Sequence, residues 1–177
     1  ETSGHLAHYK EDMYSPIDIE GEEYYLKPMN CPHHHMIYKH GQMSYKDLPL
    51  RLAEFGLVHR FERSGVLTGL IRARAFTQND SHIYCQKSQL KNELIEVLKL
   101  FKEVYNDFNI ADFWYRLSLP DFKNEEKYGD IKDKKMWEES AEMAESALKE
   151  FGVSYVKSEG EASFYGPKID VQTRNVN

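Results

Sequence analysis

The stretch LIRARAFTQNDSHIY, residues 70–84, alternates between two kinds of side chain along its length. Alternation at period two is typical of a β-strand, because successive side chains point to opposite faces. We expect the small apolar face to pack in a core and the other face to present functional groups in a row. The apolar face comprises Ile71, Ala73, Ala75 and Thr77; the other comprises Leu70, Arg72, Arg74, Phe76, Gln78, Asp80 and His82.

The preceding segments predict that this strand is one half of a hairpin. Residues 50–62, LRLAEFGLVHRFE, look extended and largely buried, and SGVLTG (64–69) is a turn-rich connection. In such a hairpin Arg60 and Glu62 share a face, and the returning strand carries further arginines.

This hairpin would bring Arg60 close to Arg72, Arg74 and Phe76. Guanidinium groups bind phosphates bidentately and an aromatic ring stacks on a base, so the cluster indicates a nucleotide-binding surface. The alternative is an exposed hairpin with scattered surface ion pairs, and the residue types alone leave both possibilities open.

The stretch NCPHHHM (30–36) has the residue types of a metal site but not the geometry of one. Consecutive side chains diverge on a helix or strand, so its cysteine and three histidines cannot converge on one ion. Residues 33–35 are better treated as one helix turn, with some side chains facing the core and some facing solvent. Cys31 and His82 are suitable zinc ligands, although two ligands 51 positions apart are a weak signal.

The remaining periodicities predict an α+β fold, with an antiparallel β-sheet flanked by helices. Apolar residues recur at three- and four-residue steps over 86–108 and 135–151, as on amphipathic helices, and Gly152 is placed to end the second. Pro32 suits the first turn of a helix. The expected strands beyond the hairpin are 24–29, 112–120, 154–160 and 162–173.

Composition favours a globular cytoplasmic protein without a membrane segment. The 177 residues include no apolar run long enough to span a bilayer, and the polar opening ETSGHLAHYKED is unlike a signal peptide. Two cysteines, Cys31 and Cys85, make no disulfide framework. A net charge of −6 counts weakly against binding nucleic acid over the whole surface.

Four motifs, in order along the chain, resemble the catalytic core of the threonyl-tRNA synthetases, a family of class II aminoacyl-tRNA synthetases. The resemblance runs from residue 3 to the end, and the hairpin matches the second signature motif of the class. It implies the class II catalytic fold, in incomplete form. The motifs are LKPMNCPHH (26–34), LPLRLAEFG (48–56), HRFERSGVLTGLIRARAFTQNDSHIYC (59–85) and FYGPKID (164–170).

The resemblance implies a role for individual residues. Cys31 and His82 match two of three protein ligands of a catalytic zinc, and the third lies outside this chain. Arg60 and Lys168 match catalytic positions, and Arg74 has a supporting role only. The ATP-binding positions are Arg60, Glu62, Arg72 and Phe76, and those lining the pocket for threonine and the adenylate are Met29, Gln78, Asp80, Tyr165 and Lys168.

The resemblance also implies the partners: ATP with Mg²⁺, L-threonine and tRNA(Thr), in an enzyme that is a homodimer at full length. No stretch resembles the editing or anticodon-binding domain, or the third motif of the class. We therefore expect residues 1–177 to be a fragment of a single catalytic domain, inactive alone. Two alternatives remain: a non-catalytic relative that binds RNA or a partner, and a sister enzyme for proline or serine, which would lack the zinc pair.

Overall fold

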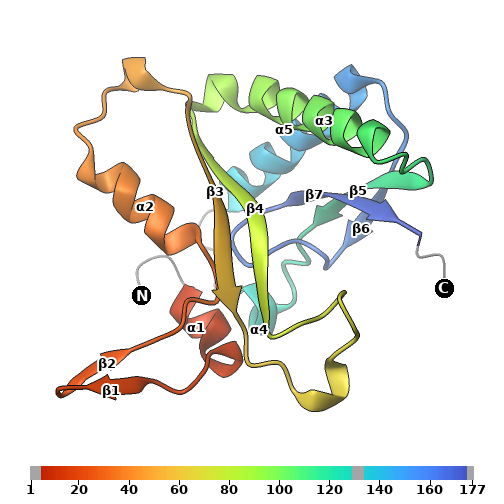
Figure 1. Ribbon diagram of the computed structural model, residues 1–177. Helices are drawn as coiled ribbons and strands as arrows, with labels where there is room; N and C mark the ends of the chain where they lie inside the picture. Colours follow the sequence, from red (N-terminus) through yellow and green to blue (C-terminus); the bar gives the residue numbers. More distant parts are fainter. Residues whose placement is uncertain (1–4, 129–133, 175–177) are drawn as a thin grey trace. The chain divides into compact units, whose positions relative to one another are not determined.

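The computed structural model describes residues 5–128 and 134–174, and the chain divides into two compact units, Glu1–Cys85 and Gln86–Asn177 (Figure 1). The expectation that both belong to one catalytic domain stays a prediction. No helix in the described part of the chain is both long and apolar enough to cross a membrane.

The first unit is built around a long antiparallel hairpin, β3 (Leu50–His59) and β4 (Ala75–Tyr84), whose register pairs Leu50 with Tyr84 and His59 with Ala75. A smaller hairpin lies near the amino terminus. The other elements of this unit are α1 (His5–Tyr9), η1 (Lys10–Asp12), β1 (Ile17–Ile19), β2 (Glu22–Tyr24), α2 (Cys31–His40), η2 (Tyr45–Asp47) and η3 (Ser64–Val66).

Helix α2 begins as the sequence predicts, with Pro32 in its first turn. The prediction for the histidines is confirmed: His34 is 3% exposed, whereas His33 and His35 are exposed. The strand predicted at 24–29 is wrong in position, since β2 ends at Tyr24. Pro28 lies in the irregular segment that follows, and proline has no backbone N–H to donate to a strand ladder.

The predicted hairpin is confirmed, but the expected burial of its faces is wrong. On β4, the face carrying Phe76 and His82 is half-buried, whereas Ala75 and Thr77 are exposed. On β3, alternate residues are exposed, and Phe55 is 82% exposed, so the strand is not largely buried. Helix α2 and the residue before it contact the polar face through hydrogen bonds, which explains why the functional row is the covered one.

Residues 70–74 are not part of the strand. The backbone N–H groups of Ile71 and Arg72 both donate to Thr68 O, at 3.0 and 3.2 Å, so the chain turns here instead of extending. Gly69 has φ +48°, a left-handed conformation that glycine tolerates.

The second unit has a three-stranded sheet of order β6–β5–β7 with two long helices. Strand β5 pairs with β7 antiparallel and with β6 parallel, so the α+β class is confirmed but this sheet is mixed. Its elements are η4 (Lys87–Gln89), α3 (Leu90–Asp107), β5 (Phe113–Leu119), α4 (Glu125–Tyr128), α5 (Lys134–Phe151), β6 (Tyr155–Glu159) and β7 (Lys168–Thr173).

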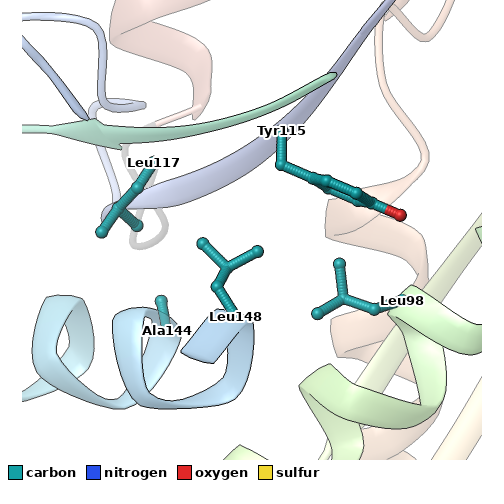
Figure 2. Close-up of a cluster of buried hydrophobic side chains, with 5 residues drawn as sticks. All are labelled: Leu98, Tyr115, Leu117, Ala144 and Leu148. Carbon is teal, nitrogen blue, oxygen red and sulfur yellow. The ribbon is translucent and has the colours of Figure 1, made fainter. Parts of the chain in front are cut away.

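The core of the second unit lies between this sheet and the helices, as Figure 2 shows. Its members are Leu98, Tyr115, Leu117, Ala144 and Leu148. Both predicted helices are confirmed, although α3 begins at Leu90 after the short turn η4 and not at residue 86. Gly152 follows α5 with φ +77°, and its N–H donates to Leu148 O and Lys149 O, both at 3.1 Å, as a helix C-cap requires.

The strand predicted at 162–173 forms only over its second half, because Ser163 and Gly166 pair across a tight turn before β7. The strands predicted at 112–120 and 154–160 are confirmed as β5 and β6.

Candidate functional site on the β3–β4 hairpin

The inner face of the hairpin gathers side chains from both strands, because residues directly opposite in an antiparallel pair share a face. Val58 lies opposite Phe76, a pair at one end of this face. Further along, Gly56 lies opposite Gln78, Glu54 opposite Asp80, and Leu52 opposite His82. The hairpin therefore supplies an aromatic ring, a carboxylate and an imidazole in one row.

Arg60 follows directly after β3 and is held in place at both backbone and side chain. Its N–H donates to Arg74 O at 2.9 Å, and its Nε donates to Pro28 O at 3.2 Å. The guanidinium carbon lies 5.2 Å from the ring centroid of Phe76 and 5.7 Å from that of Tyr9. These are cation–π distances, so the arginine is oriented by two rings and a carbonyl.

Glu62 and Arg72 form an ion pair across the loop that joins the strands. Glu62 Oε2 accepts hydrogen bonds from Nε and Nη2 of Arg72, both at 3.1 Å. Arg74 donates to the backbone carbonyl of Glu62 at 3.0 Å and lies over the ring of Phe61, so its contacts are structural. Glu62 and Arg72 line a cavity of about 370 Å³ together with Arg63, Glu11 and Asp12, so its lining carries both signs of charge.

Asp80 is positioned by Asn30, the residue before α2. Asn30 is fully buried, and its Nδ2 donates to Asp80 Oδ2 at 3.1 Å. Its Oδ1 is buried without a hydrogen-bond partner among the described residues. The amide fits only because Gly56 beneath it has no side chain: a Cβ there would collide with the amide. A fixed carboxylate on an otherwise half-buried face is suited to accept a hydrogen bond from a substrate hydroxyl or ammonium group.

His82 contacts His34, which in turn contacts Glu54, and the strand pattern predicts neither contact. His34 Nδ1 lies 2.6 Å from His82 Nδ1, and the other ring nitrogen of His34 lies 2.9 Å from Glu54 Oε1. Lys27 Nζ lies 3.6 Å from the second oxygen of Glu54. A chain of polar contacts thus runs from Lys27, between β2 and α2, through Glu54 and His34 to the predicted zinc ligand.

The two predicted zinc ligands have the chemistry that zinc accepts. Burial lowers the pKa of His82, which favours the neutral imidazole that binds metals. Burial, reinforced by Asp80 and opposed by Arg60, raises the pKa of the Cys31 thiol, and a bound metal would remove that proton. Within residues 5–128 and 134–174, no three Cys, His, Asp or Glu side chains come together closely enough to hold an ion. That Cys31 and His82 are two donors of a larger ligand set stays a prediction.

The last two predicted site residues lie in the second unit. Tyr165 is 60% exposed, and Lys168 begins β7 with its Nζ 3.1 Å from Asp170 Oδ1. Burial alone would raise the pKa of Asp170, but hydrogen bonds from Ser118, Lys168 and Arg116 outweigh it and hold that pKa below its usual value. Lys168 therefore presents an ammonium group oriented by a carboxylate. That these residues line the same pocket as Asp80 stays a prediction.

Comparison with known families decides which class of protein carries this hairpin. The family model described as the tRNA synthetase class II core domain (G, H, P, S and T) matches residues 11–174. The chain belongs to this family.

Relatives within the class confirm the resemblance to threonyl-tRNA synthetases. The threonine–tRNA ligase of Lactobacillus acidophilus is 50% identical over 98% of this chain, and that of Listeria welshimeri is 51% identical over 98%. The chain spans 27% of the length of each.

Solved structures agree. The RNA binding domain of threonyl-tRNA synthetase from Cryptosporidium parvum is 39% identical with a TM-score of 0.83, over 96% of this chain and 40% of that one. A putative threonyl-tRNA synthetase from Aeropyrum pernix is 35% identical with a TM-score of 0.82, over 96% of this chain and 38% of that one.

Sequence reasoning about this class II core missed several residues that hold the site together: Tyr9, Asn30, His34 and Glu54. Asn30 and His34 lie within a quoted motif, but their partners Asp80 and His82 are 50 and 48 positions away. No local periodicity reports contacts at that separation. The local signal at Asn30 points elsewhere: asparagine directly before a helix is typical of an N-cap, but its side chain makes no cap hydrogen bond and donates to Asp80 instead.

Proposed function

We propose that this chain is part of a threonine–tRNA ligase and forms much of its aminoacylation site. The single observation that carries the proposal is the shared inner face of the hairpin, where Phe76, Asp80 and His82 stand in a row with Arg60 at its end. The identity of about half of all positions with threonine–tRNA ligases supports it.

ATP binds at the arginine end of this row. Arg60, oriented by Pro28 O, and Arg72 bind the phosphates, with Mg²⁺ carried by the nucleotide, and Phe76 stacks on the adenine. Glu62 contacts the adenine, and in doing so it gives up one of its two hydrogen bonds from Arg72. The protein contributes chiefly orientation and fixed positive charge.

The reaction then proceeds in two steps. The threonine carboxylate attacks the α-phosphate in line, which forms threonyl-adenylate and releases pyrophosphate. A ribose hydroxyl at the 3′ end of tRNA(Thr) next attacks the acyl carbon, which forms the ester and releases AMP. The resemblance assigns Lys168, which pairs with Asp170, the role of positive charge beside the adenylate. It assigns Met29, Gln78 and Tyr165 to the lining of the adenylate pocket.

Recognition of threonine rests on Cys31, His82 and Asp80. Cys31 and His82, with a third protein ligand, would hold a zinc ion, which supplies open coordination positions for the amino and hydroxyl groups of threonine. Asp80 accepts a hydrogen bond from the substrate in the orientation that Asn30 sets. Valine lacks the hydroxyl and would leave polar groups unpaired, so it is rejected strongly, whereas serine lacks only a methyl group, worth about 1–3 kcal/mol.

The assembly state and compartment follow from the resemblance alone. We propose that the full-length protein is a homodimer, and its cytoplasmic location stays a prediction.

Threonine-dependent ATP–pyrophosphate exchange by the full-length protein tests the proposal. We expect exchange with threonine, weaker exchange with serine and almost none with valine. Cys31→Ala should abolish threonine-dependent exchange while ATP binding, measured by calorimetry, persists. Exchange that depends on proline and not on threonine would overturn the proposal in favour of a sister enzyme. The absence of exchange with every amino acid would overturn it in favour of a non-catalytic relative. The 177-residue chain alone should show little or no exchange.

A further inference from the structure

Glu54, His34 and His82 form a chain of hydrogen-bond contacts. The carboxylate at the Glu54 end determines which atom donates in each contact. Glu54 lies 2.9 Å from His34 Nε2. A carboxylate can only accept hydrogen bonds, and the second oxygen of Glu54 lies 3.6 Å from Lys27 Nζ. The proton between the two groups must therefore belong to His34 Nε2.

This assignment propagates to the next contact. With its proton on Nε2, a neutral His34 has a lone pair on Nδ1, so Nδ1 can only accept. The partner atom 2.6 Å away, His82 Nδ1, must then donate. That leaves the lone pair of His82 on Nε2, the nitrogen that a metal would bind.

We propose that Glu54 and His34 act as positioning residues that hold His82 in its Nδ1–H tautomer and present Nε2 to a metal ion. The inference rests on the proposed zinc site, because the tautomer of His82 has a function only if a metal binds there. The tautomer itself can be measured without metal. A ligating histidine commonly gives its other N–H to a fixed acceptor, which orients the ring and raises its basicity. Here that acceptor is a second histidine, 3% exposed and itself anchored by a carboxylate.

The packing around His82 supports a fixed orientation of its ring. The two rings stand edge to face, with centroids 4.7 Å apart and planes at 89°. His34 comes from α2 and Glu54 from β3. The ring of His82 on β4 is therefore held by α2 directly and by β3 through His34. His35, one residue along α2, contacts Tyr84 OH at 2.7 Å, and its ring also stands edge to face with that of His82, with centroids 5.6 Å apart.

Long-range ¹H–¹⁵N correlation spectra of the metal-free chain test the tautomer directly, at a pH of about 8, above the ordinary histidine pKa of about 6.5. We expect His82 with its proton on Nδ1. His34→Leu should move His82 toward the Nε2–H form, which an unrestrained imidazole prefers in water. His34→Asn, whose Oδ1 can accept in place of Nδ1, should restore the Nδ1–H form. His33→Leu, an exposed position on the same helix, is the matched control and should change nothing.

Zinc affinity gives a second measurement. His34→Leu should weaken zinc binding by the full-length protein by about tenfold to a hundredfold, and His34→Asn should recover most of it. A wild-type His82 found as Nε2–H, or a tautomer or zinc affinity indifferent to His34→Leu, would overturn the inference. A protein with the expected tautomer and no zinc would instead overturn the proposed metal and leave the tautomer assignment standing.

Discussion

Gly56 shows how a missing side chain can position a functional one. It lies on the inner face of β3 opposite Gln78, and the buried amide of Asn30 occupies the space that a Cβ would fill. That amide in turn donates to Asp80. The orientation of the predicted substrate-binding carboxylate therefore depends on a glycine that touches no substrate.

Gly56→Ala should destabilise the fold by about 1–3 kcal/mol, because the added methyl group cannot be accommodated without moving Asn30. Urea unfolding of the chain measures this free energy. Gly65→Ala is the control, since no atom lies within 4 Å of the position that its Cβ would occupy, and it should cost less than about 0.5 kcal/mol. Equal, small effects at both positions would show that the amide is not confined by Gly56.

At this scale the sequence predicts the members of the row but not what holds them. Alternation along 76–82 identifies Phe76, Gln78, Asp80 and His82 as sharing one face, and they do. Whether that face is covered depends on α2, which packs against it from residues nearly fifty positions away. The strand pattern alone therefore predicts the wrong face as the core.

At the scale of elements, helix α3 packs on the core of its unit through Leu98, with Leu94 partly buried. Phe101 and Phe108, further along the same stripe, are exposed. Leu98 is 2% exposed within the core drawn in Figure 2, whereas Leu100 on the same helix is 59% exposed. The three- and four-residue periodicity predicts such a stripe, and helices are the part of this fold that sequence predicts best. Strand pairing is predicted less well: the predicted order of strand, helix and strand over 112–160 is typical of a parallel crossover, yet we expected an antiparallel sheet.

Leu98→Ala should lower the free energy of unfolding by about 2–5 kcal/mol, since it leaves a cavity among residues that cannot all close in. Leu100→Ala, the same substitution at an exposed position of the same helix, should cost less than about 0.5 kcal/mol. Chemical denaturation of both variants makes the comparison, and similar losses would mean that α3 does not pack through this stripe.

A carboxylate on α5 ties that helix to β6. Glu145 accepts hydrogen bonds from Tyr155 and from Lys157, both at 2.8 Å, and pairs with Lys149. Hydrogen bonds from Lys149, Lys157 and Tyr155 lower the pKa of Glu145 to about 2. A depressed pKa in the folded state means that this stabilisation is present near neutral pH and is lost as pH falls from about 4.5 toward about 2.

Glu145→Gln should therefore cost about 0.5–1 kcal/mol at pH near 7, a modest value because the carboxylate is partly exposed and solvent screens its ion pairs. The difference between variant and wild type should shrink when unfolding is measured near pH 3. Glu142→Gln, an exposed carboxylate on the same helix, serves as the control and should have little effect at either pH. A deficit for Glu145→Gln that stays constant with pH would contradict the assigned ion pairs.

At the scale of the whole molecule, the chain contributes a hairpin row in its first unit and an oriented lysine in its second. The chain covers 27% of the length of the relatives, and the third zinc ligand outside residues 1–177 stays a prediction. No run of glycine, proline or serine marks the boundary at Cys85, and composition therefore could not predict that the chain forms two compact units.

The proposed recognition of threonine depends on Cys31 and His82 being ligands of one zinc ion. Elemental analysis of the purified full-length protein tests this dependence directly, with Cys31→Ala and His82→Ala beside the wild type and His33→Ala as the exposed control. We predict about one zinc per wild-type chain, retained in the control and lost in both ligand variants. A wild-type protein without zinc, or zinc retained in both ligand variants, would contradict the assignment.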